Sequence, residues 1–190
     1  MDFSKECNYG FIMKFTETKL KGAFEIELEP FFDERGFFAR TWCQKEFKDH
    51  GLNPNLAQIS IAFNKKIGTI RGMHYQLPPH SEAKLVCSSR GRIYDVIIDL
   101  RPDSKTFKEW FSIELTQDNF KMVYVPEGCA HGYQTLEDNT EVIYQMSVSH
   151  MPDLYRGVRW NDPTFGIKWP QTENIIISEK DKSYVNVSQF

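Results

Sequence analysis

Apolar and polar residues alternate over short stretches along most of the chain. From Phe24 to Leu28 every second residue is apolar and the residues between are glutamates, until Pro30 ends the pattern. A similar alternation runs from Gln58 to Asn64. A period of two predicts β-strands with one face in a core and the other in water. Further strand-like runs, separated by turn residues, cover residues 69–76, 84–88, 93–100, 110–115, 122–125, 133–136 and 140–148.

The first half of the chain contains one helical candidate, from Cys43 to His50, which Gly51 would close as a C-terminal cap. Short strands with a turn about every 8 to 12 residues are typical of a sandwich, jelly roll or small barrel. The pattern therefore predicts an all-β fold with a few short peripheral helices. Residues 1–12 lack a period and are expected to form an N-terminal extension. Residues 13–190 are expected to form one domain, with a peripheral segment after Pro170.

Composition and charge narrow the possible partners. The 190 residues are 41% hydrophobic and 26% charged, as expected of a soluble domain with a core. A net charge of −3 without a basic run gives no support to a nucleic-acid partner. No apolar run is long enough to span a membrane, and the first residues lack the pattern of a secretory signal. Together with four cysteines that stand singly, this predicts a cytoplasmic protein with reduced thiols and no membrane partner.

The densest group of candidate functional residues lies in the run from Arg71 to Gln76. Strand alternation places Arg71 on one face and puts His74 and Gln76 on the other, where Gly72 leaves room beside the histidine. A histidine there is a candidate acid or base, because its charge changes near neutral pH.

Four further residues favour an acid–base pocket. Lys84 begins a strand, Tyr144 lies on the apolar face of another, and His131 follows a turn at the head of a third. Asp95 lies deep in an apolar strand and needs a partner there, because an unpaired buried carboxylate is unstable. Two histidines, a lysine, an aspartate and a tyrosine on the strands of one β domain are typical of proton-transfer sites.

Metal binding is the main alternative to an acid–base pocket. His74, Glu82 and His131 offer three ligands of the kind that jelly-roll metalloenzymes use, but Gln76 stands where a close histidine pair would have its second member. The chain has neither the Gly-x-Ser-x-Gly turn of serine hydrolases nor a glycine-rich phosphate loop.

In their order and spacing, the motifs of this chain closely resemble those of the sugar-nucleotide epimerases typified by dTDP-4-dehydrorhamnose 3,5-epimerase. The resemblance runs from about Met13 to Tyr184. It rests on the segments 33–38 (Asp-Glu-Arg-Gly-Phe-Phe), 71–76, 83–86 (Ala-Lys-Leu-Val), 94–96, 126–128 (Pro-Glu-Gly) with 130–132 (Ala-His-Gly), Tyr144, 159–163 (Arg-Trp-Asn-Asp-Pro), 166–170 and 177–181 (Ile-Ser-Glu-Lys-Asp).

The resemblance implies a metal-free, cupin-like jelly roll (a double-stranded β-helix) that forms a homodimer and holds its active site in the barrel lumen. It implies that His74 is the catalytic base, that Asp181 orients it, and that Tyr144 is the acid on the opposite face of the sugar. Lys84 would stabilise the enolate that forms between them. The implied reaction uses no cofactor.

The resemblance also implies a substrate, a nucleoside-diphosphate 4-keto-6-deoxyhexose such as dTDP-4-dehydro-6-deoxyglucose. It would be epimerised at C3 and C5, or at C3 alone, in deoxysugar (rhamnose-type) biosynthesis. Arg35 and Arg71 are expected to grip the diphosphate or the sugar. His150 replaces an aromatic residue that many members carry six residues after the tyrosine, and Cys87 replaces a frequent arginine. The candidate substrate-binding residues are Arg35, Arg71, Gln58, Gln76, Asp95, His131 and His150.

Two further alternatives share this fold, a sugar-nucleotide 3,4-ketoisomerase and a non-catalytic sugar-binding module. The set of His74, Lys84 and Tyr144 favours the epimerase over the module. The Phe-rich stretch from Phe24 to Phe38 offers more apolar surface than one small core needs, which favours a homodimer.

Overall fold

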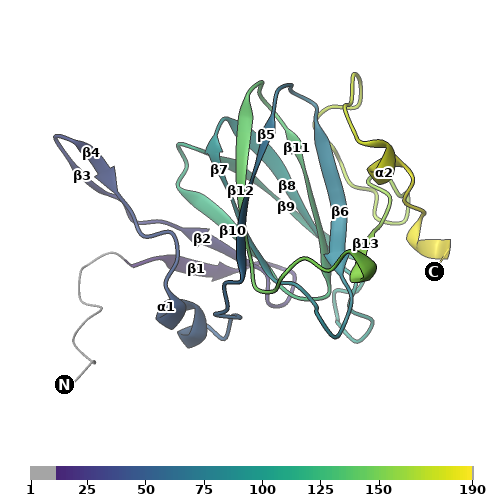
Figure 1. The fold of residues 1–190 in the computed structure, drawn as a ribbon, viewed down its shortest axis with the longest axis horizontal. Coiled ribbons are helices and arrows are strands. Elements are labelled where there is room, and N and C mark those ends of the chain that lie inside the picture. Colours follow the sequence, from purple (N-terminus) through teal and green to yellow (C-terminus); the bar gives the residue numbers. More distant parts are fainter. Residues whose placement is uncertain (1–11, 190) are drawn as a thin grey trace.

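The computed structural model describes residues 12–189, and in this range the chain is built mainly from antiparallel strands in two sheets (Figure 1). The first sheet has the order β1 (Lys14–Glu17), β2 (Phe24–Glu27), β10 (Lys121–Val125), β7 (Lys84–Arg90), β12 (Thr140–Met146), β5 (Gln58–Asn64). The second has the order β13 (Tyr155–Gly157), β6 (Ile70–Gln76), β11 (Cys129–Thr135), β8 (Arg92–Asp99), β9 (Trp110–Thr116). The predicted all-β jelly roll is confirmed.

Short elements surround the two sheets. Strands β3 (Phe31–Asp33) and β4 (Gly36–Phe38) form a separate hairpin that projects away from the barrel (Figure 1). The helices are α1 (Gln44–Asp49), α2 (Glu179–Lys182) and the 3₁₀ turns η2 (Pro152–Leu154) and η3 (Val187–Gln189). The expected N-terminal extension, residues 1–12, lies outside the described residues except for Ile12. Within residues 12–189, no helix is long and apolar enough to cross a membrane.

A core of interdigitated side chains joins the two sheets over part of their area. Val86 and Val142 from the first sheet pack there with Ile93 and Ile97 from β8 in the second, and all four are buried. Because side chains alternate along a strand, Ile98 of β8 points to the opposite face, where it packs under the C-terminal segment. Each fully buried aliphatic side chain contributes about 1.5 to 3 kcal/mol.

Helix α1 covers the outer face of the first sheet, close to the predicted position. Phe47 is buried there against Tyr124 of β10. Gly51 has a φ of +71°, and beyond it the Leu52 N–H donates to the Phe47 carbonyl at 2.9 Å. This bond satisfies a carbonyl at the end of the helix, so the predicted glycine cap is confirmed.

The prediction that the apolar face of the strand at 58–64 packs into the core is wrong. Ile59 and Ile61 are 60% and 59% exposed on the outer face of β5. Gln58 and Ser60 face inward, into a cavity between the sheets. The period of two is present, but β5 is an edge strand and its inner face borders a polar cavity. The polar side chains therefore point inward and the apolar side chains point outward.

The prediction that Arg71 and His74 lie on opposite faces of their strand is also wrong, since both line the same cavity. Tyr133 of β11 pairs with Arg71 and His131 pairs with His74, so β6 carries one residue more than β11 over this stretch. Such a bulge reverses the alternation beyond it. Gly72 permits the bulge, because its φ is +130° and a Cβ there would come within 2.5 Å of the Gly132 Cα.

The segment after Pro170 is not peripheral as predicted. Ile176 forms a parallel bridge with Thr69, and the Gln171 N–H donates to Gln134 of β11 at 2.8 Å. Figure 1 shows this segment and α2 beside β6. Residues 176–178, 180 and 181 therefore form one wall of the cavity.

Candidate active site

A cavity of about 800 Å³ lies between the sheets where the apolar core ends. Strands β5, β7 and β12 line one side, and β6, β11 and β13 line the other. The C-terminal segment closes a further side. A volume of this size suits a ligand as large as a nucleotide sugar.

His74 and Asp181 form a hydrogen-bonded pair in this cavity. His74 Nε2 lies 2.7 Å from Asp181 Oδ1, although the two residues come from β6 and from α2. Asp181 is fixed at its side chain and at its backbone. The Gly72 N–H donates to the other carboxylate oxygen at 3.3 Å, and Ser178 Oγ caps the helix by accepting from the Asp181 N–H. A carboxylate only accepts, so Nε2 carries the proton and Nδ1 keeps its lone pair.

Burial and charge set the protonation of this pair. Burial lowers the pKa of His74, and Lys84 and His131 lower it further, against the opposing effect of Asp181. Burial acts to raise the pKa of Asp181, but the bonds from His74 and Gly72 outweigh it and the pKa is lowered. At neutral pH the pair is therefore a neutral imidazole beside an ionised carboxylate, which is the state of a general base.

Tyr144 stands on the wall opposite His74, because it comes from β12 in the other sheet. Its hydroxyl lies 3.1 Å from the hydroxyl of the buried Tyr133. Burial, and then the neighbouring Tyr133, raise the pKa of Tyr144. The phenol stays neutral and keeps a proton to give.

Lys84, at the start of β7, lines the cavity with its ammonium 2.9 Å from Glu82 Oε1. His131 and Asp95 form a second pair, with Nε2 and Oδ2 2.8 Å apart. Asp95 is fully buried behind His131, and burial raises its pKa against the opposing effect of His131 and Lys84. The expectation that Asp95 needs a partner is confirmed.

Three of the predicted substrate-binding residues have exposed side chains that line the cavity. Gln58, Arg71 and His150 line it and are exposed. The Arg71 guanidinium is held by Asn64, to which its Nε donates at 2.9 Å, and Gln58 accepts from the His150 N–H at 2.7 Å. These groups are placed to meet the polar parts of a ligand.

Besides Asp95, two more of the predicted binding residues do not line the cavity of their own chain. The buried Gln76 uses its amide to hold loops together, donating to the His80 and Ser149 carbonyls and accepting from the Met151 N–H at 2.8 Å. Arg35 lies on the exposed β3–β4 hairpin, bound to Asp33.

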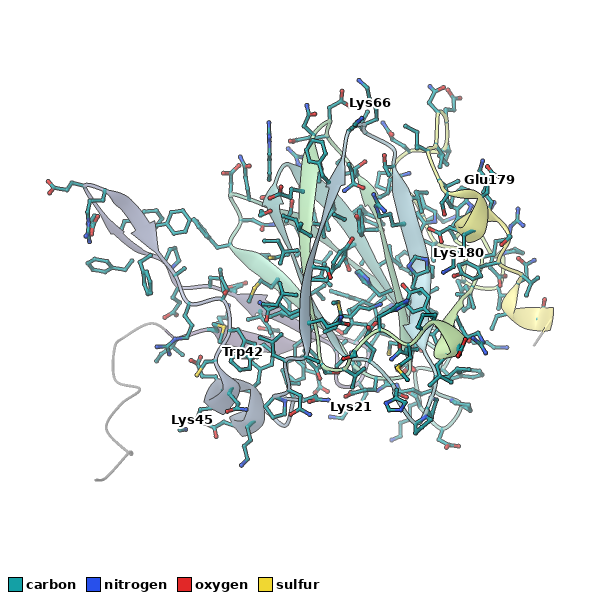
Figure 2. All side chains as sticks on the ribbon, viewed as in Figure 1. Lys21, Trp42, Lys45, Lys66, Glu179 and Lys180 are labelled. Carbon is teal, nitrogen blue, oxygen red and sulfur yellow. The ribbon has the colours of Figure 1, made fainter. Side chains whose placement is uncertain are left out.

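Tyr155 and Lys180 line the cavity although the sequence did not single them out. The Tyr155 ring lies 5.2 Å from the His74 ring and 4.7 Å from the His150 ring. The Lys180 ammonium is 5.0 Å from the Tyr155 centroid, and Figure 2 shows Lys180 on α2, the helix to which it belongs. Strand β13 is three residues long and shows no period, so the sequence carried no signal for Tyr155 beyond its nearness to the Arg159–Trp160 motif.

The three residues considered as metal ligands are each paired with another side chain. His74 pairs with Asp181, His131 with Asp95, and Glu82 with Lys84. Among residues 12–189, no group of three or more His, Cys, Asp or Glu side chains is arranged to hold a metal ion. The described side chains thus do not fit a metal centre.

Comparison with known proteins gives one consistent family. Residues 17–189 match the family model described as dTDP-4-dehydrorhamnose 3,5-epimerase. A curated protein of that name from Sinorhizobium fredii is 39% identical over 165 residues, which are 87% of this chain and 85% of the relative.

Solved structures agree with the family model. A dTDP-4-dehydrorhamnose 3,5-epimerase from Bacillus anthracis with TDP and PPi bound is 39% identical, with a TM-score of 0.89 over 93% of this chain and 100% of that one. A dTDP-6-deoxy-D-glucose-3,5-epimerase from Legionella pneumophila in complex with dTDP-4-keto-L-rhamnose is 29% identical, with a TM-score of 0.88 over 93% and 94% of the two chains. The resemblance noted in the sequence is confirmed.

Proposed function

Because the chain belongs to the dTDP-4-dehydrorhamnose 3,5-epimerase family, and is therefore an enzyme of the isomerase class, we propose that it epimerises a nucleoside-diphosphate 4-keto-6-deoxyhexose. The most fitting substrate is dTDP-4-dehydro-6-deoxyglucose, and the pathway is deoxysugar (rhamnose-type) biosynthesis. The observation that carries the proposal is that His74 and Tyr144 lie on opposite walls of one cavity, where burial lowers the pKa of the histidine and raises the pKa of the phenol. We also propose that residues 13–190 form one domain, which holds this site.

His74 is the base of the proposed reaction. The C4 ketone makes the hydrogens on C3 and C5 acidic, so a neutral imidazole with a free Nδ1 removes one of them as a proton. The histidine becomes an imidazolium, and Asp181 at 2.7 Å stabilises that charge while holding the ring in place.

Lys84 stabilises the charge that develops on the C4 oxygen. Loss of the proton converts the ketone to an enolate, whose oxygen is more negative than the oxygen of the ketone. A fixed ammonium therefore binds the transition state more strongly than the substrate, which lowers the barrier.

Tyr144 returns a proton to the other face of the ring. Inversion requires that the carbon lose its proton on one face and gain one on the opposite face. The hydroxyl of Tyr144 lies across the cavity from His74 and is held by Tyr133 at 3.1 Å. The reaction moves protons only, so it requires neither an oxidant nor a reductant.

Solvent exchange tests the proposed reaction. The purified protein with dTDP-4-dehydro-6-deoxyglucose in deuterated water is expected to incorporate deuterium at C3, at C5 or at both, with an inverted product. A product with its ketone at C3 would identify a 3,4-ketoisomerase. Ligand binding without exchange would identify a sugar-binding module, and either result overturns the epimerase proposal.

We also propose that the enzyme acts as a homodimer. Apolar side chains are largely exposed at two places, with Ile59 and Ile61 on β5 and Phe32 and Phe37, 62% and 57% exposed, on the β3–β4 hairpin. A hairpin that projects from its own barrel is suited to lie on the outer face of a second copy. Arg35, at the tip of that hairpin, would then reach the substrate bound by the partner.

A cytoplasmic location remains a prediction. Cys43, Cys87 and Cys129 are free thiols, which fits a reducing compartment.

A further inference from the structure

Glu82 and Lys84 form a buried ion pair in the cavity wall. The carboxylate side chain is 4% exposed and the lysine side chain 10%, with 2.9 Å between Oε1 and Nζ. Taking an ammonium out of water favours its neutral form unless a negative partner compensates. Lys84 can stabilise an enolate only as a cation. Whether it is a cation depends on the charged groups around it.

Among the described residues, no other carboxylate forms an ion pair with Lys84. Asp181 is engaged by His74, and Asp95 by His131, each through a short hydrogen bond. Asp95 is fully buried behind the cavity wall. Glu82 is therefore the carboxylate in direct contact with the charge of Lys84.

The remaining groups that face Lys84 do not supply a negative charge. Tyr133 from β11, Tyr144 from β12 and Tyr155 from β13 all have a pKa raised mainly by burial, so their phenols are neutral. The carboxylate of Glu82 adds to the rise for Tyr155. Arg71, His150 and Lys180 are basic.

The ion pair holds the ammonium without using up its hydrogen-bond donors. Within the described residues, Glu82 Oε1 accepts no aligned hydrogen bond, so its contact with Lys84 is ionic. On another side the ammonium lies 5.9 Å from the centroid of the Tyr155 ring, which attracts a cation through its π-face. The N–H bonds of Lys84 that do not face Glu82 are thus left for an oxygen of the substrate.

The backbone between the two residues is pinned to the neighbouring strand. Ala83 N–H donates to Ser147 Oγ at 2.9 Å, and Ser147 N–H donates to the Ala83 carbonyl at 3.0 Å. Residues two apart in extended chain lie on the same side, so fixing Ala83 directs both Glu82 and Lys84 into the cavity.

We infer that Glu82 is a positioning residue that keeps Lys84 charged and directed at the oxygen on which the enolate charge develops. This inference rests on the proposed epimerase function. Glu82 makes no bond to the substrate in this role and acts through the lysine alone.

The variant Glu82→Gln tests this role because it removes the charge and keeps the shape. We expect kcat to fall about 10- to 100-fold while KM changes less than about 2-fold, since the lost interaction matters only in the transition state. Glu82→Asp, which restores the charge, should recover part of the rate. Glu46→Gln is the matched control, because Glu46 is also ion-paired, to Arg40, but lies in α1 outside the cavity.

A second measurement needs no substrate. The titration of Lys84 can be followed by ¹³C NMR of its Cε, assigned by comparison with Lys84→Met. In Glu82→Gln the midpoint should fall by about one pH unit or more, and in Glu46→Gln it should not move.

An unchanged midpoint, or an unchanged kcat in folded Glu82→Gln, overturns the inference. Failure of the wild-type protein to turn over any nucleotide sugar overturns the proposed function instead. The NMR titration still decides in that case whether Glu82 holds the charge of Lys84.

Discussion

At the scale of single residues, the protonation state of each buried group in the site depends on the charged side chain that partners it. His74 is kept neutral by burial and is oriented by Asp181, whereas Lys84 is paired with Glu82 at 2.9 Å. The cavity therefore holds an uncharged base on β6 and, on β7 in the other sheet, a charged electrostatic stabiliser. Their opposite protonation states follow from their different partners.

The pH dependence of the wild-type enzyme tests the state of His74. Because the base must be neutral, kcat/KM should rise with pH through the pKa of His74. Burial lowers that pKa, so the midpoint of the acid limb should lie below 6.5, the ordinary value for histidine. A midpoint above this value would contradict the account.

The variant Asp181→Asn separates orientation from charge. The carboxylate of Asp181 raises the pKa of His74 against burial, so its removal should shift the acid limb of kcat/KM to lower pH. The rate at the plateau should fall about 100-fold or more, because the imidazolium loses its partner. A shift to higher pH would be incompatible with the sign of this interaction.

At the scale of the elements, the bulge in β6 brings Arg71 and His74 into one cavity. Strand alternation in the sequence could not reveal this, because one extra residue reverses which face the following side chains take. Gly72 was visible in the sequence, but its closeness to Gly132, which is far away in the sequence on β11, was not. The period of two on β5 was likewise visible, whereas the cavity on its inner side depends on the whole sheet order.

Gly72→Ala tests the close approach at the bulge. A Cβ would meet the Gly132 Cα at 2.5 Å with φ at +130°, so we expect a loss of about 2 to 4 kcal/mol in the free energy of unfolding, measured by denaturant titration. Gly51→Ala, at φ +71° with no atom within 4 Å of the new Cβ, should lose only about 1 kcal/mol. Equal losses would mean that the positive φ alone, without the close approach to Gly132, explains why position 72 requires a glycine.

At the scale of the whole molecule, the sequence predicted the jelly roll because most strands are long enough to show their period. Strands β1, β3, β4 and β13 were missed because, with three or four residues each, they are too short to show a period. The pairing of His74 with Asp181 joins residues 107 positions apart, and only the family motif in the sequence suggested it. The exposed β5 face and the projecting hairpin are the features that a second copy would explain.

Subunit complementation tests the proposed role of Arg35 in the dimer. Arg35→Ala and His74→Asn should each lower activity strongly when alone. If Arg35 serves the partner's site, refolding an equal mixture should restore roughly a quarter of the wild-type rate, because half of the dimers are mixed and half of their sites are intact. No recovery in mixed dimers, or a monomer by sedimentation at micromolar concentration, would contradict the arrangement.

The central claim is that His74 and Tyr144 act on opposite faces of the sugar, and deuterium incorporation in two variants tests it most directly. His74→Asn should abolish both exchange and product, since neither Lys84 nor a neutral phenol can replace the base. Tyr144→Phe loses only the proton donor, so the enolate should still form and regain a proton from His74, with deuterium incorporated, configuration retained and epimerisation greatly slowed. Equal loss of exchange in both folded variants, or normal product formation by Tyr144→Phe, would contradict the assignment of the two faces.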